Sequence, residues 1–155
     1  MRLAFGADHA GFALKQHLIE FSRSLGHEVR DFGTHGSESV DYADFAEPVA
    51  RAVVAGDVDL GVVVCSNGVG VSITANKVPG ARCALCHTSW GAARARLHTG
   101  ANVLALGALE IGTAIAEECL RAFLEHEPEG GRHERRRAKV ADVERRGIAG
   151  EVVRP

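Results

Sequence analysis

Apolar residues along this chain follow two alternating patterns. Short strand-like segments, most of them continuous apolar runs typical of buried β-strands, occur five times, and each is followed by a stretch whose apolar residues recur every three or four positions, as on one face of an α-helix. The predicted strands are residues 2–6, 28–32, 60–65, 82–86 and 102–106. The predicted helices are residues 10–25, 42–55, 69–77, 89–97 and 111–124.

Strict alternation of strands and helices with short connections predicts an α/β fold, in which a five-stranded parallel sheet is covered by helices on both faces. The length of 155 residues fits one domain, residues 1–155. The composition changes after Pro128, where a basic and helix-prone segment begins. We therefore expect a core of about residues 1–127 and a C-terminal helical extension, residues 128–155, that packs on another element or on a partner subunit.

The composition limits which binding partners and which cellular location are expected. The net charge of −2 gives no global reason to expect nucleic acid or a membrane surface as a partner. No apolar stretch is long enough to span a bilayer, and the first apolar run is too short for a secretion signal. A cytoplasmic location is the default expectation, and the four cysteines are then expected to be free thiols.

Candidate chemistry gathers where the predicted strands end, because ligands bind beyond the carboxyl ends of parallel strands. Asp8 and His9 follow the first strand, and Cys65 ends the third, directly before the glycine-rich turn 66–70. Such a turn before a helix leaves backbone N–H groups free for an anion and favours the thiolate form of a nearby cysteine. Cys65 is therefore a candidate base beside a stabiliser of negative charge.

Simpler interpretations of these residues stay open at this point. Cys65 is equally the type of small apolar residue that ends a buried strand, and Asp8 and His9 suit a helix cap and a surface histidine. The turn lacks the third glycine of a dinucleotide fingerprint, since Ile73 stands there. The first loop has Phe12 where a nucleotide-binding loop needs lysine, so neither nucleotide class is supported.

Other motifs are weaker. The run Cys83-Ala-Leu-Cys86-His87 matches a haem-attachment pattern, but it lies inside a predicted strand, and no second ligand pair has the spacing of a zinc site. His98 follows a predicted helix, where a histidine is often only a partner of the helix dipole. Arg132 and Arg136 share one helix face and suit a phosphate monoester, although most basic runs are solvated faces.

Taken together, these residues resemble the type B ribose-5-phosphate isomerases, which share a family with the galactose-6-phosphate isomerase subunits. The resemblance runs in family order over nearly the whole chain. The matching pieces are Phe5-Gly-Ala-Asp8-His9-Ala-Gly-Phe12, Asp41-Tyr42, Val64-Cys65 with Gly68-Val-Gly70, Ala75-Asn76-Lys77, His98, Asn102-Val-Leu, and Gly130-Gly-Arg132-His133 with Arg136.

The resemblance implies a Rossmann-like three-layer αβα sandwich, a homodimer or dimer of dimers with active sites shared between subunits, and no metal or organic cofactor. It implies that Cys65 is the base and that His98 opens the sugar ring. The substrate-binding residues that it implies are Asp8, His9, Ser66, Asn67, Gly68, Val69, Gly70, Thr99, Arg132 and Arg136.

The implied reaction interconverts ribose 5-phosphate and ribulose 5-phosphate through an enediolate. One base can move a proton between C1 and C2 while fixed donors stabilise the enediolate. Three positions depart from the family pattern: Thr99 replaces asparagine, Leu109 replaces a phosphate-binding arginine, and Ser66-Asn67 replaces the usual Gly-Thr or Gly-Ser. The alternatives are therefore an isomerase of the same mechanism for another sugar phosphate, such as a tetrose phosphate or galactose 6-phosphate, and a non-catalytic paralogue that binds a phosphorylated ligand.

Overall fold

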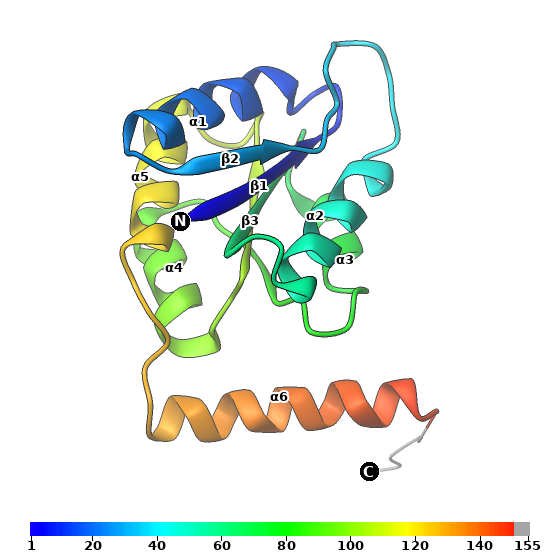
Figure 1. Ribbon diagram of the computed structural model, residues 1–155, viewed down its shortest axis with the longest axis vertical. Coiled ribbons are helices and arrows are strands. Elements are labelled where there is room, and N and C mark those ends of the chain that lie inside the picture. Colours follow the sequence, from blue (N-terminus) through cyan, green and yellow to red (C-terminus); the bar gives the residue numbers. More distant parts are fainter. Residues whose placement is uncertain (151–155) are drawn as a thin grey trace.

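The computed structural model describes residues 1–150, so the last five residues of the predicted extension lie outside the described residues. Five parallel strands form one sheet in the order β2-β1-β3-β5-β4 (Figure 1). Their bounds are β1 Arg2–Ala7, β2 Glu28–Asp31, β3 Leu60–Cys65, β4 Cys83–Leu85 and β5 Val103–Gly107. The predicted five-stranded parallel α/β fold is confirmed.

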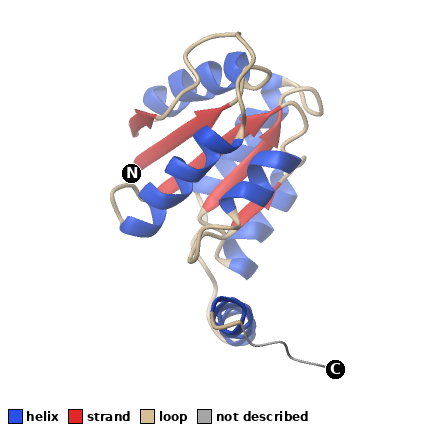
Figure 2. Ribbon diagram, turned by 90° about the vertical axis from the view of Figure 1, so that its right-hand side faces the viewer, coloured by secondary structure: helices blue, strands red, loops and turns tan. Residues whose placement is uncertain are grey.

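Helices cover both faces of this sheet (Figure 2). Apolar residues of α1, α4 and α5 form one core with the strands, and those of α2 and α3 form a second core on the opposite face. The helices are α1 Phe12–Ser24, α2 Ala43–Ala55, α3 Val69–Ala75, α4 Ser89–Arg94, α5 Thr113–Leu124 and α6 Arg132–Ile148. No helix within residues 1–150 combines the length and apolar character needed to cross a membrane.

Strand β3 shows how the sequence sets these layers. Every one of its residues is buried, because it lies between β1 and β5 and both of its faces are covered. Side chains alternate between the faces, so Val62 and Val64 pack into the α1–α4–α5 core and Val63 into the α2–α3 core. Cys65 therefore ends the strand on the side of α2 and α3.

Several helix boundaries differ from the predicted ones by one or two residues. The first helix begins at Phe12 rather than at residue 10. The predicted helix 89–97 continues past α4 as a turn of π-helix, η1, over Ala95–Thr99. It continues because Gly100, with φ of 62°, is the residue that ends it, and Thr99 Oγ1 donates a hydrogen bond of 2.6 Å back to Ala95 O. His98 is consequently inside the helical segment.

In the C-terminal segment, α6 lies apart from the sheet beyond the amino ends of the strands (Figures 1 and 2). It contacts η1 near its start, and near its end Glu144 Oε1 accepts a hydrogen bond of 3.0 Å from Gly80 N–H. Between these points a cavity of about 720 Å³ separates α6 from the core. Val140 and Val143 of α6 line this cavity and remain more than half exposed.

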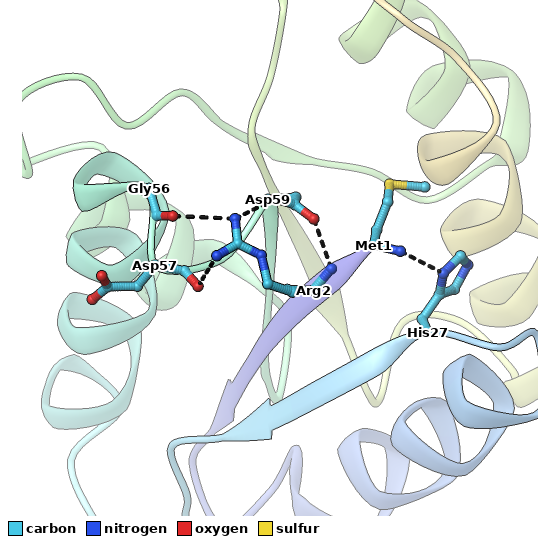
Figure 3. A network of polar contacts seen from close by, with 6 residues as sticks. All are labelled: Met1, Arg2, His27, Gly56, Asp57 and Asp59. Atoms are coloured by element: carbon cyan, nitrogen blue, oxygen red, sulfur yellow. Dashed lines mark hydrogen bonds and ion pairs between the residues drawn. The ribbon is translucent and has the colours of Figure 1, made fainter.

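A polar network fixes the start of β1 (Figure 3). The Arg2 guanidinium donates to the carbonyl oxygens of Gly56 and Asp57 and to the carboxylate of Asp59, and the Arg2 N–H donates to that carboxylate at 2.7 Å. The Met1 amino group lies 3.4 Å from His27 Nδ1. These contacts join β1 to the turn before β3 and so support the alignment of the two strands whose other ends carry Asp8 and Cys65.

A buried ion pair anchors the loop that follows β2. Lys15, which is fully buried, donates from Nζ to Asp31 Oδ1 at 2.6 Å and to Thr34 O at 2.7 Å. Gly33 N–H donates to the same carboxylate oxygen at 2.9 Å. Burial by itself raises the pKa of Asp31, but the hydrogen bonds from Lys15 and Gly33 outweigh it and hold this pKa below its ordinary value.

Replacing Lys15 with methionine is expected to destabilise the fold by about 3–5 kcal/mol, because Asp31 would be left as a buried charge without its cation. Urea unfolding measures the loss, and Lys139→Met, on an exposed side chain, should change stability by no more than about 0.5 kcal/mol.

Since folding lowers the pKa of Asp31, the contribution of this carboxylate to stability is present above its unfolded pKa of about 4 and is lost as the pH falls through the folded pKa. An unchanged unfolding midpoint in Lys15→Met would contradict this account.

Candidate active site

One group of predicted site residues lies at the carboxyl end of the sheet and is called the carboxyl-end cluster: Asp8, His9, Cys65, Ser66, Asn67, Gly68, Val69 and Gly70. Asp8 follows β1, and its N–H donates to Val64 O at 3.2 Å, so it lies beside the end of β3. Its carboxylate accepts the Gly11 N–H at 2.9 Å, which also makes it the polar cap before α1.

His9 is held by a loop that the sequence analysis does not assign to the site. The Val40 N–H donates to His9 Nδ1 at 3.2 Å. Since a backbone N–H can only donate, Nδ1 is the acceptor, and a neutral His9 carries its proton on Nε2. His9 therefore presents a hydrogen-bond donor to a ligand.

The turn after β3 is built around the Cys65 sulfur. The Gly68 N–H donates to Cys65 Sγ at 3.1 Å, and this donor favours a negatively charged sulfur. Asn67 Oδ1 accepts the Val69 N–H at 3.0 Å and lies 3.9 Å from Sγ. Gly68 has φ of 77°, and a Cβ there would lie 2.4 Å from Leu85 Cδ1, so glycine is required.

The same turn offers donors to a ligand. Among residues 1–150 no acceptor is recorded for the Gly70 or Val71 N–H, as expected for the first turn of a helix. The turn is fixed from the side of β5, because Ala108 N–H and Leu109 N–H donate to Cys65 O and Ser66 O, both at 2.8 Å. Fixed donors beside a thiol can stabilise an oxyanion that the thiol creates by removing a proton.

Tyr42, which stands in one of the matching pieces, has no role assigned from the sequence. Its ring lies so close to the start of α3 that a Cβ on Gly70 would be 2.8 Å from Tyr42 Cζ. The ring is partly exposed, with 44% of the residue accessible. Tyr42 therefore forms a wall next to the free donors of the turn.

The second group lies at the amino end of the sheet and is called the amino-end cluster: His98, Thr99, Arg132, His133 and Arg136. The His98 and His133 rings are stacked, with centroids 4.0 Å apart and an angle of 12° between their planes. Arg132 and Arg136 are exposed on α6, one turn apart. Two guanidinium groups beside imidazoles suit a phosphate dianion.

A metal ion fits the amino-end cluster less well than an anion does. His98, Glu129 and His133 each offer a ligand atom, and these atoms lie within 4.8 Å of one another. The two imidazole rings are stacked, however, so the lone pairs in their planes do not converge on a common point. Arg132 and Arg136 add positive charge, which opposes a cation.

The two clusters do not meet within one chain. Cys65 is aligned with Gly107, the last residue of β5, whereas His98 precedes the first residue of that strand. Five residues of strand at about 3.3 Å each separate the two ends by roughly 15 Å. The structure therefore brings the predicted residues together as two half-sites on opposite ends of the sheet.

The other three cysteines are chemically distinct from Cys65. Burial raises the pKa of Cys86 and of Cys119 to about 11, and it also raises the pKa of Cys83. All three are free thiols, as expected. Cys86 and Cys119 are core residues, whereas Cys83 is partly exposed at the edge of the α2–α3 core.

A Rossmann-like sheet, a thiol beside a donor-rich turn and a pair of exposed arginines are the features expected of a sugar-phosphate isomerase. Comparison with known proteins supports this class. The family model described as Ribose/Galactose Isomerase matches residues 3–140, and the chain belongs to this family.

Three relatives illustrate the similarity. Ribose-5-phosphate isomerase B of Escherichia coli is 41% identical over 94% of this chain and 97% of its own length. D-erythrulose-4-phosphate isomerase of Pectobacterium atrosepticum is 39% identical over 84% of this chain and 87% of its own. The solved structure of Clostridium thermocellum ribose-5-phosphate isomerase B, 46% identical, superposes with a TM-score of 0.93 over 95% of this chain and 99% of that chain.

Proposed function

We propose that this enzyme interconverts ribose 5-phosphate and ribulose 5-phosphate through an enediolate, with Cys65 as the base. The hydrogen bond from Gly68 N–H to Cys65 Sγ carries the proposal, because it places a stabilised sulfur next to the unpaired N–H groups of the turn. The similarity to ribose-5-phosphate isomerases B from two organisms supports the choice of substrate.

Several residues of the carboxyl-end cluster have a step in this reaction. The Cys65 thiolate removes the C2 proton of the open-chain aldose and returns it to C1, while the O2 proton moves to O1, so the enzyme gains and loses no proton overall. The Gly70 N–H, on a partly exposed residue, donates to an enediolate oxygen, whose charge appears only in the transition state and the intermediate. Asp8 and the Nε2–H of His9 bind substrate oxygens.

The amino-end cluster supplies the remaining steps. His98 transfers the protons that accompany opening of the cyclic sugar, a task for an imidazole, which has one nitrogen that donates and one that accepts. Arg132 and Arg136 bind the phosphate through charge-assisted hydrogen bonds. Thr99 takes the place of a family asparagine, and its hydroxyl proton is already directed at Ala95 O, so it can only accept a hydrogen bond from the substrate.

Because the two half-sites are separate in one chain, we infer that two copies of the chain assemble with the carboxyl-end cluster of one against the amino-end cluster of the other. The exposed apolar residues support this. Val69 and Ile73 of α3 are 43% and 55% exposed beside the Cys65 turn. Val140 and Val143 line the open cavity beside His98. Pairing these surfaces buries apolar area on both sides.

One observation favours an alternative substrate. Leu109, where the family has a phosphate-binding arginine, is 80% exposed, and its N–H is bonded to Ser66 O in the Cys65 turn. An apolar side chain at this place removes one phosphate contact, and the similarity to an erythrulose-4-phosphate isomerase points to a tetrose phosphate as the alternative.

Turnover of a panel of tetrose, pentose and hexose phosphates tests the proposal. Ribose 5-phosphate is expected to give the highest kcat/KM. A higher value for a tetrose phosphate, or for galactose 6-phosphate, would keep the mechanism and replace the substrate. No turnover of any member would end both enzyme hypotheses and leave a protein that binds a phosphorylated ligand without reaction.

A further inference from the structure

His133 is the residue of the amino-end cluster to which nothing above assigns a step. It is the second residue of α6 and is 5% exposed, although both of its neighbours on the helix are exposed. Its ring covers one face of the His98 ring at 4.0 Å. A buried histidine stacked on the residue that opens the sugar ring calls for an explanation beyond helix packing.

Hydrogen bonding fixes the state of the His133 ring. Arg132 Nε donates to His133 Nε2 at 3.2 Å, closer than the Glu129 carboxylate oxygen at 3.5 Å from the same nitrogen. A guanidinium cannot accept, so Nε2 carries a lone pair. A neutral His133 therefore has its proton on Nδ1. Burial, together with the nearby charges of His98 and Arg132, lowers the pKa of His133 and keeps it neutral.

Apart from the stack with His133, two arginine contacts of His98 are recorded, and neither fixes the plane of its ring. Arg137 Nη1 donates to the His98 backbone carbonyl at 3.4 Å, which holds the main chain and not the ring. Arg94 Nη1 lies 3.4 Å from His98 Nε2, at one edge of the ring. The stack with His133 is the one aromatic contact of the His98 imidazole face among residues 1–150.

Ring opening makes this orientation important. In a cyclic aldose the anomeric hydroxyl loses its proton as C1 becomes an aldehyde carbon, the C1–O4 bond breaks, and O4 takes up a proton. One imidazole that serves both oxygens must hold its plane while it accepts one proton and gives back another. Orientation of a catalytic group within a narrow range is worth large factors in rate.

We propose that His133 is a positioning residue for ring opening: its neutral, buried ring is the wall that holds the His98 imidazole in the plane needed to act on the cyclic sugar. This inference rests on the proposed function, because it assigns a partner to the ring-opening residue. It predicts that His133 matters for the cyclic substrate and not for the proton transfer that Cys65 performs.

Two reactions of the intact enzyme distinguish an effect on ring opening from an effect on the proton transfer by Cys65. Ribose 5-phosphate is mainly a closed ring and needs opening, whereas ribulose 5-phosphate lacks the free 5-hydroxyl that would close a five-membered ring and enters as an open chain. Exchange of the C1 proton of ribulose 5-phosphate with D₂O, followed by NMR, therefore reports the Cys65 step alone. Turnover of ribose 5-phosphate reports both steps.

The variants are His133→Leu, which fills the buried space without a flat ring, and His133→Phe, which restores the flat ring. In His133→Leu, kcat/KM for ribose 5-phosphate should fall about tenfold or more, while the exchange rate of ribulose 5-phosphate stays within about twofold of the unmodified enzyme. His133→Phe should recover most of the lost turnover. Glu134→Ala, on the exposed side of the same turn, is the control and should change neither reaction.

Equal activity of His133→Leu and His133→Phe on ribose 5-phosphate would overturn the proposal, since a flat ring would then be unnecessary. An equal fall of both reactions in His133→Leu would also overturn it, because a loss of folding or phosphate binding affects both. Failure of the proposed function is distinguishable from these results: the unmodified enzyme would then catalyse neither reaction.

Discussion

Replacing Cys65 with alanine is expected to lower kcat for aldose–ketose interconversion by roughly 10³-fold, within the range that general acid–base groups contribute. The reason is geometric: Sγ receives the Gly68 N–H at 3.1 Å and lies at the start of the turn whose Gly70 and Val71 N–H groups are free. Exchange of the substrate C2 proton with solvent should be lost together with turnover. Steady-state kinetics and NMR exchange measure the two effects.

Substrate binding should survive this change, because alanine removes only the sulfur atom. The affinity of Cys65→Ala for ribose 5-phosphate, measured by calorimetry, should stay close to that of the unmodified enzyme. Cys83→Ala is the matched control: this thiol is partly exposed at the start of β4, and its replacement should leave kcat unchanged. Undiminished turnover in Cys65→Ala would remove this residue from the role of base.

The sequence predicted the layers of the fold well because its signals are local. The central strands are continuous apolar runs and each covering helix has one apolar face, so the apolar pattern identified both. The end of the helix before His98 was harder to predict. A π-helical turn carries this helix through Thr99, and it depends on the hydrogen bond from Thr99 Oγ1 to Ala95 O, which no apolar pattern reveals.

The carboxyl-end cluster was also predictable, since residues directly after parallel strands meet at one edge of the sheet. What the sequence could not show is the support around it. Val40 holds His9 from 31 positions away, and Tyr42 packs on Gly70 across the loop before α2. Such contacts join segments distant in the chain, and neither has a motif of its own.

For the amino-end cluster, the sequence predicted the residues but not their position relative to Cys65. The spacing of Arg132 and Arg136 indicated a phosphate site, but the place of that site relative to Cys65 depends on where α6 leaves the core. The tertiary structure places α6 beyond the amino ends of the strands, stacked through His133 on His98. The half-sites lie one strand length apart because of the fold topology, and residue types alone do not predict this distance.

Mixing two inactive variants is expected to restore activity if the half-sites come from different subunits. Cys65→Ala damages the carboxyl-end cluster, and His98→Asn damages the amino-end cluster. In a mixed dimer, one site combines both lesions, and the other combines the intact Cys65 of one chain with the intact His98 of the other. Half of the dimers are mixed after random reassortment and each has one good site, so about one quarter of normal activity should return.

The experiment denatures the two purified variants together, refolds them and measures turnover of ribose 5-phosphate, with native mass spectrometry to count mixed dimers. The matched control mixes His98→Asn with an Arg132→Ala, Arg136→Ala double variant. Both of these chains are damaged in the amino-end cluster, so every site in their mixed dimer has a lesion and no activity should return.

The size of the recovery distinguishes the possible arrangements because each gives a different number. Sites contained in one chain give no recovery however many mixed dimers form, and this result would contradict the proposed assembly. Recovery near one quarter requires that Cys65 and His98 come from different chains, which agrees with their separation by the length of β5. A chain that sediments as a monomer while it is active would remove the shared site altogether, because roughly 15 Å between the half-sites is too far for one sugar phosphate to reach both the base and the ring-opening histidine.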